Sequence, residues 1–315
     1  RRAAHPLQVS GMVERTPLFD IFTQIVLFLG LVSALMPFAI VVIAATHDLR
    51  TVNEVPMPLV PGHDFLKNAA EAWQRADLGP KIVNSVIFAA GVALGKVCIA
   101  ALSAFSLVYF RYRGRVIIFW LIFVTLMLPL EVRIVPTYAV AANVLSPYQT
   151  LLDLMGVSWL IEQVTGYRIA LQWGLLNTYT GLILPLIATA TGTFLYRQFF
   201  MTIPDELAEA AKMDGAGALR FFRDILVPLS RTNMAALGTI MFVWAWNQYL
   251  WPLLVTTDSA HGTAVMELRE LIPGAFGIPD WNVAMAGTLV IMVPPLVVVI
   301  LMQRWFVRGL IATEK

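Results

Sequence analysis

Residues 204–228 read PDELAEAAKMDGAGALRFFRDILVP and are the least lipid-like part of a very apolar chain. Pro204 suits the first turn of a helix, where its missing N–H costs nothing, and the two acidic residues after it complement the positive end of the helix dipole. Thr202, just upstream, is a candidate N-cap. Gly215 then permits a bend before an apolar face resumes. The stretch therefore predicts a short polar helix between two membrane-spanning segments.

The composition of the chain indicates an integral membrane protein. Hydrophobic residues make up 58% of its 315 residues and charged residues 13%, and the mean hydropathy is +0.74, whereas soluble domains carry about 25% charged residues. The single cysteine, Cys98, excludes an internal disulfide and is expected to be a small buried residue. The Gly-x-x-x-x-Gly-Lys-Ser/Thr nucleotide-binding pattern does not occur, so we expect no ATP hydrolysis, and the four histidines lack metal-ligand spacing.

Six apolar segments are long enough to cross ~30 Å of hydrocarbon, which predicts an all-α polytopic fold with one transmembrane domain over residues 21–315. The tail over residues 1–20 carries three arginines and is expected to be solvated. Residues 145–177 are a mixed segment that is too polar in its second half to span and amphipathic enough to lie at the membrane interface. The predicted spans are 21–45, 82–110, 116–144, 179–200, 233–255 and 282–306.

The distribution of Lys and Arg predicts the orientation of these spans, because cytoplasmic connections are enriched in both. The N-terminal tail, the turn at 111–115, residues 197–231 and the C-terminus carry fourteen of the 22. The connections on the opposite side carry six. Both termini and the 204–228 helix are therefore predicted to face the cytoplasm.

Charged residues inside predicted spans are expensive and are functional candidates by default. Lys96 lies near the middle of the second span, and Glu131 and Arg133 lie near the middle of the third. Residues two apart on a helix point about 200° from each other, so Glu131 and Arg133 cannot pair side by side. We therefore expect Glu131 to neutralise Lys96, while Arg133 projects into a pathway where its guanidinium suits a phosphate. The alternative is a subunit-interface network of all three residues without substrate contact.

Aromatic and amide side chains form a second group of candidates, on the fifth span. Asn247 and Gln248 are expected to line a wet path, and Trp244 is a further pathway candidate. The aromatic rings of this span could stack on a polyol, or they could pack in the core or in an interfacial belt.

Seven positions of the 204–228 stretch resemble the EAA loop of ABC importer permeases, although Val227 replaces the usual Leu before the final proline. They are Glu209, Ala210, Ala211, Gly215, Ile225, Val227 and Pro228. In that family the loop is a coupling helix that docks on a cytoplasmic ATPase. The resemblance implies that Glu209 makes an ion-pairing contact there, within a docking segment that also includes Asp214. The alternative is an interfacial amphipathic helix that only joins two spans.

The chain from about residue 20 to its end resembles the carbohydrate-uptake branch of these permeases, and most closely the second permease subunit of sn-glycerol-3-phosphate importers. The stretches that carry this resemblance are TLMLPLEVRI (125–134), FLYRQFFMT (194–202), WNQYLWPLL (246–254) and MQRWFVRGL (302–310). Sugar permeases usually carry uncharged residues at the positions of Lys96 and Arg133. The resemblance therefore implies transport of sn-glycerol-3-phosphate or a glycerophosphodiester, with an uncharged sugar or oligosaccharide as the alternative.

The resemblance also implies partners and a mechanism. In the family, such a subunit works in the bacterial inner membrane with a second, non-identical permease, a homodimer of ATPase subunits that bind ATP and Mg, and a periplasmic binding protein. Transport then proceeds by alternating access. The insertion at 145–173 departs from the family pattern and affects the surface expected to meet the binding protein. Two other function classes remain open, a membrane enzyme that uses Glu131 and Lys96 as an acid–base pair, and an assembly scaffold without a pathway.

Overall fold

The computed structural model describes residues 17–125, 128–167, 170–272 and 280–312, and all regular elements within these ranges are helical. Three continuous helices are long and apolar enough to cross a membrane. They coincide with the predicted first, second and sixth spans, and that each of them crosses a membrane stays a prediction. They are α1 (Pro17–Ala45), α4 (Leu78–Tyr109) and α17 (Trp281–Ala312). The predicted tail lies outside the described residues up to position 16, and its last four residues belong to α1.

The third predicted span, 116–144, is two helices rather than one. The first, α5 (Arg115–Val124), is followed by α6 (Leu130–Ala142). Pro129 takes the N-cap position of α6 with an extended backbone. Because proline lacks an N–H and clashes with the preceding turn, it begins a new helix here instead of continuing the old one.

The fourth and fifth predicted spans are also interrupted. Span 179–200 consists of α9 (Tyr179–Ile183), the 3₁₀ turn η2 (Leu184–Leu186) and α10 (Ala190–Phe200), with a 50° bend before α10. Span 233–255 consists of α14 (Arg231–Trp246) and α15 (Leu250–Val255). A proline lies in η2 and another in α15, and each removes a backbone donor close to the break.

The polar helix predicted over residues 204–228 is shorter than expected. The surface helix is α11 (Asp205–Met213), and Gly215 adopts a φ of +73° directly after it, which confirms the predicted bend. The chain then returns through α12 (Ala218–Phe221), the π-helical segment η3 (Phe222–Leu226) and α13 (Val227–Leu229). Thr202 does not cap α11; its hydroxyl donates to the carbonyl of Phe199 at 2.7 Å.

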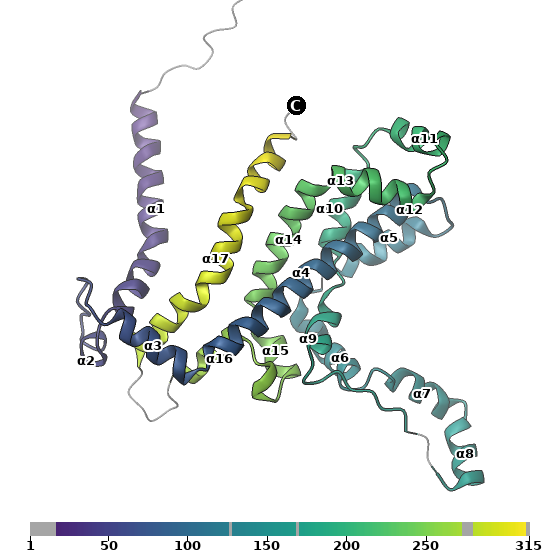
Figure 1. Cartoon of the computed structure of the whole chain (residues 1–315), viewed down its shortest axis with the longest axis horizontal. Helices are drawn as coiled ribbons and strands as arrows, with labels where there is room; N and C mark the ends of the chain where they lie inside the picture. The colour runs from purple at the N-terminus through teal and green to yellow at the C-terminus, as the bar shows by residue number, and fades with distance from the viewer. Residues whose placement is uncertain (1–16, 126–127, 168–169, 273–279, 313–315) are drawn as a thin grey trace, which may run out of the picture.

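The elements at the opposite end of the molecule from α11 are short (Figure 1). The predicted insertion forms two helices that project from the body as an arm, α7 (Ser146–Leu154) and α8 (Val157–Thr165). The remaining short elements are α2 (Leu49–Val52), α3 (Phe65–Arg75), η4 (Ser259–His261), α16 (Ala264–Glu267) and η5 (Leu268–Leu271). Arg75 hydrogen-bonds to Asp280 at the start of α17, and this bond raises the pKa of Arg75.

Buried polar contacts hold the loop before α17 against α4. Lys81 Nζ lies 3.1 Å from Glu267 Oε1, and both side chains are largely buried. The Asn84 amide donates to the carbonyls of Ala260 at 2.8 Å and Gly262 at 3.0 Å. The loop that links the last two spans is therefore fixed to the start of α4.

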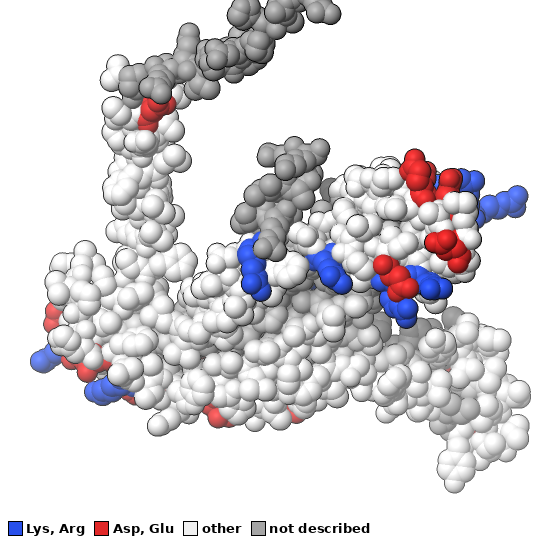
Figure 2. Space-filling view, turned by 45° about the horizontal axis from the view of Figure 1, so that its top comes forward, with Lys and Arg blue, Asp and Glu red and all other residues white. Residues whose placement is uncertain are grey.

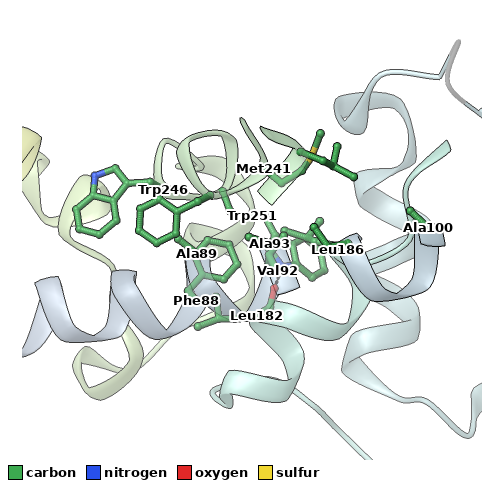
Figure 3. Packing of buried hydrophobic residues seen from close by; sticks show 14 of the residues in the cluster. Phe88, Ala89, Val92, Ala93, Ala100, Leu182, Leu186, Met241, Trp246 and Trp251 are labelled. Atoms are coloured by element: carbon green, nitrogen blue, oxygen red, sulfur yellow. Dashed lines mark hydrogen bonds between the residues drawn. The ribbon is translucent and has the colours of Figure 1, made fainter. Parts of the chain in front are cut away.

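The core is built around α4, which packs against α10 and α14 (Figure 1). Small residues recur on its buried face, and a Cβ on Gly192 of α10 would lie only 2.8 Å from the Ala100 Cβ, so the two helices approach closely. Figure 3 shows the aromatic part of this core, where Trp246 and Trp251 are fully buried. These rings are packing residues, one of the two roles expected for them.

The distribution of charged side chains on the molecular surface is typical of a membrane protein. Charged side chains gather at the end that carries α11 and at the lower left of the view, a few basic side chains lie near its middle, and most of the remaining surface is uncharged (Figure 2). Cys98 belongs to the outer face of α4 and is exposed, which corrects the expectation that it is buried. Its neighbour Val97 is buried, because adjacent helical residues point in different directions.

Candidate functional site

The broken spans border an open cavity of about 570 Å³ on one side of α4. Its walls come from α4, α5, α10 and α14, and α6 contributes Arg133. Apolar side chains such as Met241 form part of the lining. The polar side chains of the lining include Lys96, Arg133, Ser103, Thr125, Thr189 and Thr193.

Lys96 reaches this cavity from the buried face of α4. Its side chain is only 6% exposed, and its Nζ lies 3.6 Å from the ring centroid of Trp244 on α14. Such a cation–π contact stabilises an ammonium group but does not neutralise it. Within the described part of the chain, no carboxylate lies within 4.0 Å of the Lys96 ammonium.

Arg133 faces the same cavity from the first part of α6. Its Nε is buried and has no hydrogen-bond partner among the described residues. Arg133 and Lys96 also repel each other electrostatically. The cavity therefore holds two positive charges without a counter-ion among the residues that the structure describes, which suits an anionic ligand.

The predicted pairing of Glu131 with Lys96 is wrong. Glu131 is exposed in the first turn of α6, where a carboxylate complements the helix dipole, and it forms no ion pair with Lys96. Arg133, two residues later, takes the direction that faces Lys96. The acid–base pair that a membrane enzyme would require is therefore not assembled.

Of the three candidate residues on the fifth span, only one lines the cavity. Trp244 lines the cavity, and its role in a substrate pathway stays a prediction. Asn247 and Gln248 lie at the C-terminal end of α14, outside that lining, and their amides donate to the carbonyls of Val243 at 2.9 Å and Trp244 at 3.3 Å. Both side chains bond to carbonyl groups at the end of the helix, and the Val243 carbonyl also accepts from the backbone N–H of Asn247 at 3.2 Å.

The sequence analysis missed the threonines at the start of α10. Thr189, Thr191 and Thr193 line the cavity only because the fourth span breaks before Ala190. A signal was present, since a proline at position 185 precedes a threonine and small residues that suit a helix start. The expectation of one continuous span concealed it.

The segment that resembles a coupling loop lies on the surface. Glu209, Ala210 and Asp214 are exposed, whereas Ala211 is buried against the core. Aromatic contacts connect the returning chain to α4, with ring centroids 5.2 Å apart for Tyr109 and Phe221. The chain that follows α11 thus packs against the end of α4, the helix that carries Lys96.

Comparison with known proteins decides the family. Residues 96–312 match the family described as binding-protein-dependent transport system inner membrane component. The chain belongs to this family of ABC importer permeases. This permease is therefore a membrane transport subunit of the inner membrane, rather than an enzyme.

Similar proteins cover almost the whole permease. The sn-glycerol-3-phosphate transport system permease proteins UgpE of Yersinia enterocolitica and Salmonella typhi are 44% and 45% identical to it over 310 residues, which span 96% of this chain and 100% of each relative. The solved structure of a bacterial ABC transporter involved in the import of the acidic polysaccharide alginate aligns with a TM-score of 0.70. It is 17% identical and covers 94% of this chain and 100% of that one, which shows the shared fold.

Proposed function

We propose that this permease carries sn-glycerol-3-phosphate or a glycerophosphodiester across the inner membrane by alternating access. The observation that carries this proposal is the pair of cations, Lys96 and Arg133, in one cavity without a carboxylate partner among the described residues. A positive charge inside a membrane costs about 3 kcal/mol, and an anionic substrate would offset that cost.

Two further observations favour a phosphate ester over an uncharged sugar. The names of the relatives state sn-glycerol-3-phosphate transport, and those relatives match the permease over 96% of its length. The planar guanidinium of Arg133 has donors in a fork that matches phosphate oxygens. An uncharged sugar would leave both charges of the cavity unsatisfied.

The partners of this permease follow from its family. We propose a second, non-identical permease, a homodimer of ATPase subunits that bind ATP and Mg, and a periplasmic binding protein. The exposed carboxylate of Glu209 on α11 is available to the ATPase, and the distribution of Lys and Arg favours a cytoplasmic position for α11 and for both termini. Movement of α11 would reach the cavity through the aromatic contacts to α4.

The test is a transport assay on the complete complex in liposomes, with its own binding protein and labelled sn-glycerol-3-phosphate. We expect ATP-dependent accumulation of the label that excess unlabelled phosphate ester suppresses and excess maltose does not. Accumulation of labelled maltose, or no accumulation of the phosphate ester by an ATP-hydrolysing complex, would contradict the proposal.

A further inference from the structure

We propose that the first turn of α10 is a backbone seat for the phosphate group in this cavity, and that it acts together with Lys96 and Arg133. The inference rests on the proposed function and adds a third part to the site. It assigns the phosphate to main-chain N–H groups, which no side-chain motif of the sequence reveals.

The geometry of the fourth span creates this seat. Thr189 is extended, with φ −145° and ψ 123°, and α10 begins at Ala190 after the 50° bend. The start of an 11-residue helix is thereby placed at a cavity between spans instead of at the membrane surface. The first N–H groups of a helix have no acceptor within the helix and carry the positive end of its dipole.

Two backbone N–H groups in the first turn of α10 have no hydrogen-bond acceptor in the described part of the chain. The N–H of Gly192 donates weakly to the Thr189 hydroxyl, at 3.4 Å. The N–H groups of Ala190 and Thr191 have no acceptor among the described residues, and both residues line the cavity. Backbone N–H groups at a helix start are well suited to bind phosphate oxygens.

The second, independent observation comes from the facing side chains. Only 6% of the Lys96 side chain is exposed, so it is 94% buried, and it has no hydrogen bond to the described part of the protein. The buried Nε of Arg133 is likewise unpartnered. Buried polar groups normally have partners, so unpartnered donors from α4, α6 and α10 around one cavity indicate a shared acceptor. A phosphate group has enough oxygens to accept from all of them.

One substitution removes a donor of this seat at a position whose backbone suits proline. Ala190→Pro deletes the N–H at the first helical position, where proline is tolerated, and Thr189 before it already has the extended backbone that proline requires. The matched control is Leu49→Pro, which deletes the N–H at the first position of α2, where Asp48 is likewise extended and Leu49 is exposed outside the cavity. In the complete complex, we expect Ala190→Pro to lower the turnover of sn-glycerol-3-phosphate about tenfold or more, as for one lost hydrogen bond to a charged group, and Leu49→Pro to stay within about twofold.

A second measurement does not depend on the proline variant folding. In a Cys98→Ser background, the thiol of Thr191→Cys should react with a small alkylating reagent more slowly in the presence of sn-glycerol-3-phosphate than in the presence of glycerol. As a control, the thiol of Asp153→Cys, on α7 of the arm, should react at the same rate in the presence of sn-glycerol-3-phosphate and of glycerol. Equal alkylation of Thr191→Cys under both conditions would overturn the seat.

Arg133→Gln, measured in parallel, separates the seat from the proposed function. If Arg133→Gln abolishes uptake while Ala190→Pro behaves as Leu49→Pro does, the seat is overturned and the proposed function stands. If neither Arg133→Gln nor Ala190→Pro changes uptake, both the seat and the proposed function are overturned. Loss of turnover in Ala190→Pro together with protection of Thr191→Cys would support the seat.

Discussion

Lys96 and Arg133 show what single residues reveal about this permease. Both were recognisable in the sequence, because charges are rare in apolar spans. Their partners were not, since the predicted Glu131 pairing assumed that the third span continues as one helix. The break before Leu130 places Glu131 on the exposed side and Arg133 on the cavity side.

Lys96→Met is expected to separate stability from function. Removing an uncompensated buried charge should stabilise the purified complex, with a rise in melting temperature of about 2–4 °C for each kcal/mol gained. Uptake of sn-glycerol-3-phosphate should fall, because one of the two cations is lost. A thermal melt and a transport assay on the same preparation check both parts.

The matched control for Lys96→Met is Lys67→Met, on the exposed face of α3. We expect Lys67→Met to change neither the melting temperature nor the uptake measurably, as is usual for surface positions. A lower melting temperature for Lys96→Met than for the wild type would show that Lys96 is a structural residue.

At the scale of elements, the sequence predicted which segments are apolar but not where they break. Prolines occur inside the continuous helices α1 and α17 as well as beside the breaks in the third and fourth spans. Neighbouring helices can satisfy the backbone groups that a proline frees. The effect of a proline therefore depends on tertiary packing, and the cavity threonines of α10 could not be placed from the sequence alone.

The buried pair of Lys81 and Glu267, which fixes the loop before α17, should dominate local stability. Lys81→Met leaves the Glu267 carboxylate buried without its partner, which typically costs ~3–5 kcal/mol. A clear drop in the melting temperature of the complex is expected, with partial recovery in the double variant Lys81→Met/Glu267→Gln. Arg75→Gln, which breaks a far more exposed ion pair, should cost less than about 1 kcal/mol. Equal effects of the two single substitutions would refute this account of the loop.

The surface helix α11 should determine assembly with the ATPase. Glu209→Ala is expected to reduce the amount of ATPase that co-purifies with the permease, because Glu209 is exposed and has no ion-pair partner in the described part of the chain. Glu206→Ala removes another exposed carboxylate from the same helix and is the matched control. Undiminished ATPase recovery with Glu209→Ala would assign the coupling contact to other residues.

At the scale of the whole molecule, the family and the all-helical fold could be predicted from the sequence. The hydropathy of the segments and the spacing of the 204–228 stretch do not depend on where the individual helices break. The arm of α7 and α8 was predicted only as an amphipathic insertion. Its projection from the body depends on tertiary structure (Figure 1).

The orientation of the molecule can be tested with single cysteines in a Cys98→Ser background. Asp214→Cys, beside α11, should react with a membrane-impermeant maleimide only in inside-out vesicles. Glu162→Cys, on α8, should react only in right-side-out vesicles. The reverse pattern would contradict the cytoplasmic position of α11.

The central claim is that the cavity cations hold the phosphate of the substrate, and uptake by the Arg133→Gln complex tests it most directly. Labelled sn-glycerol-3-phosphate should accumulate about tenfold more slowly or worse, as expected for a lost charge-assisted hydrogen bond. ATPase co-purification should be unchanged, and Arg133→Lys should retain part of the activity. Unchanged uptake by an intact Arg133→Gln complex would contradict the claim.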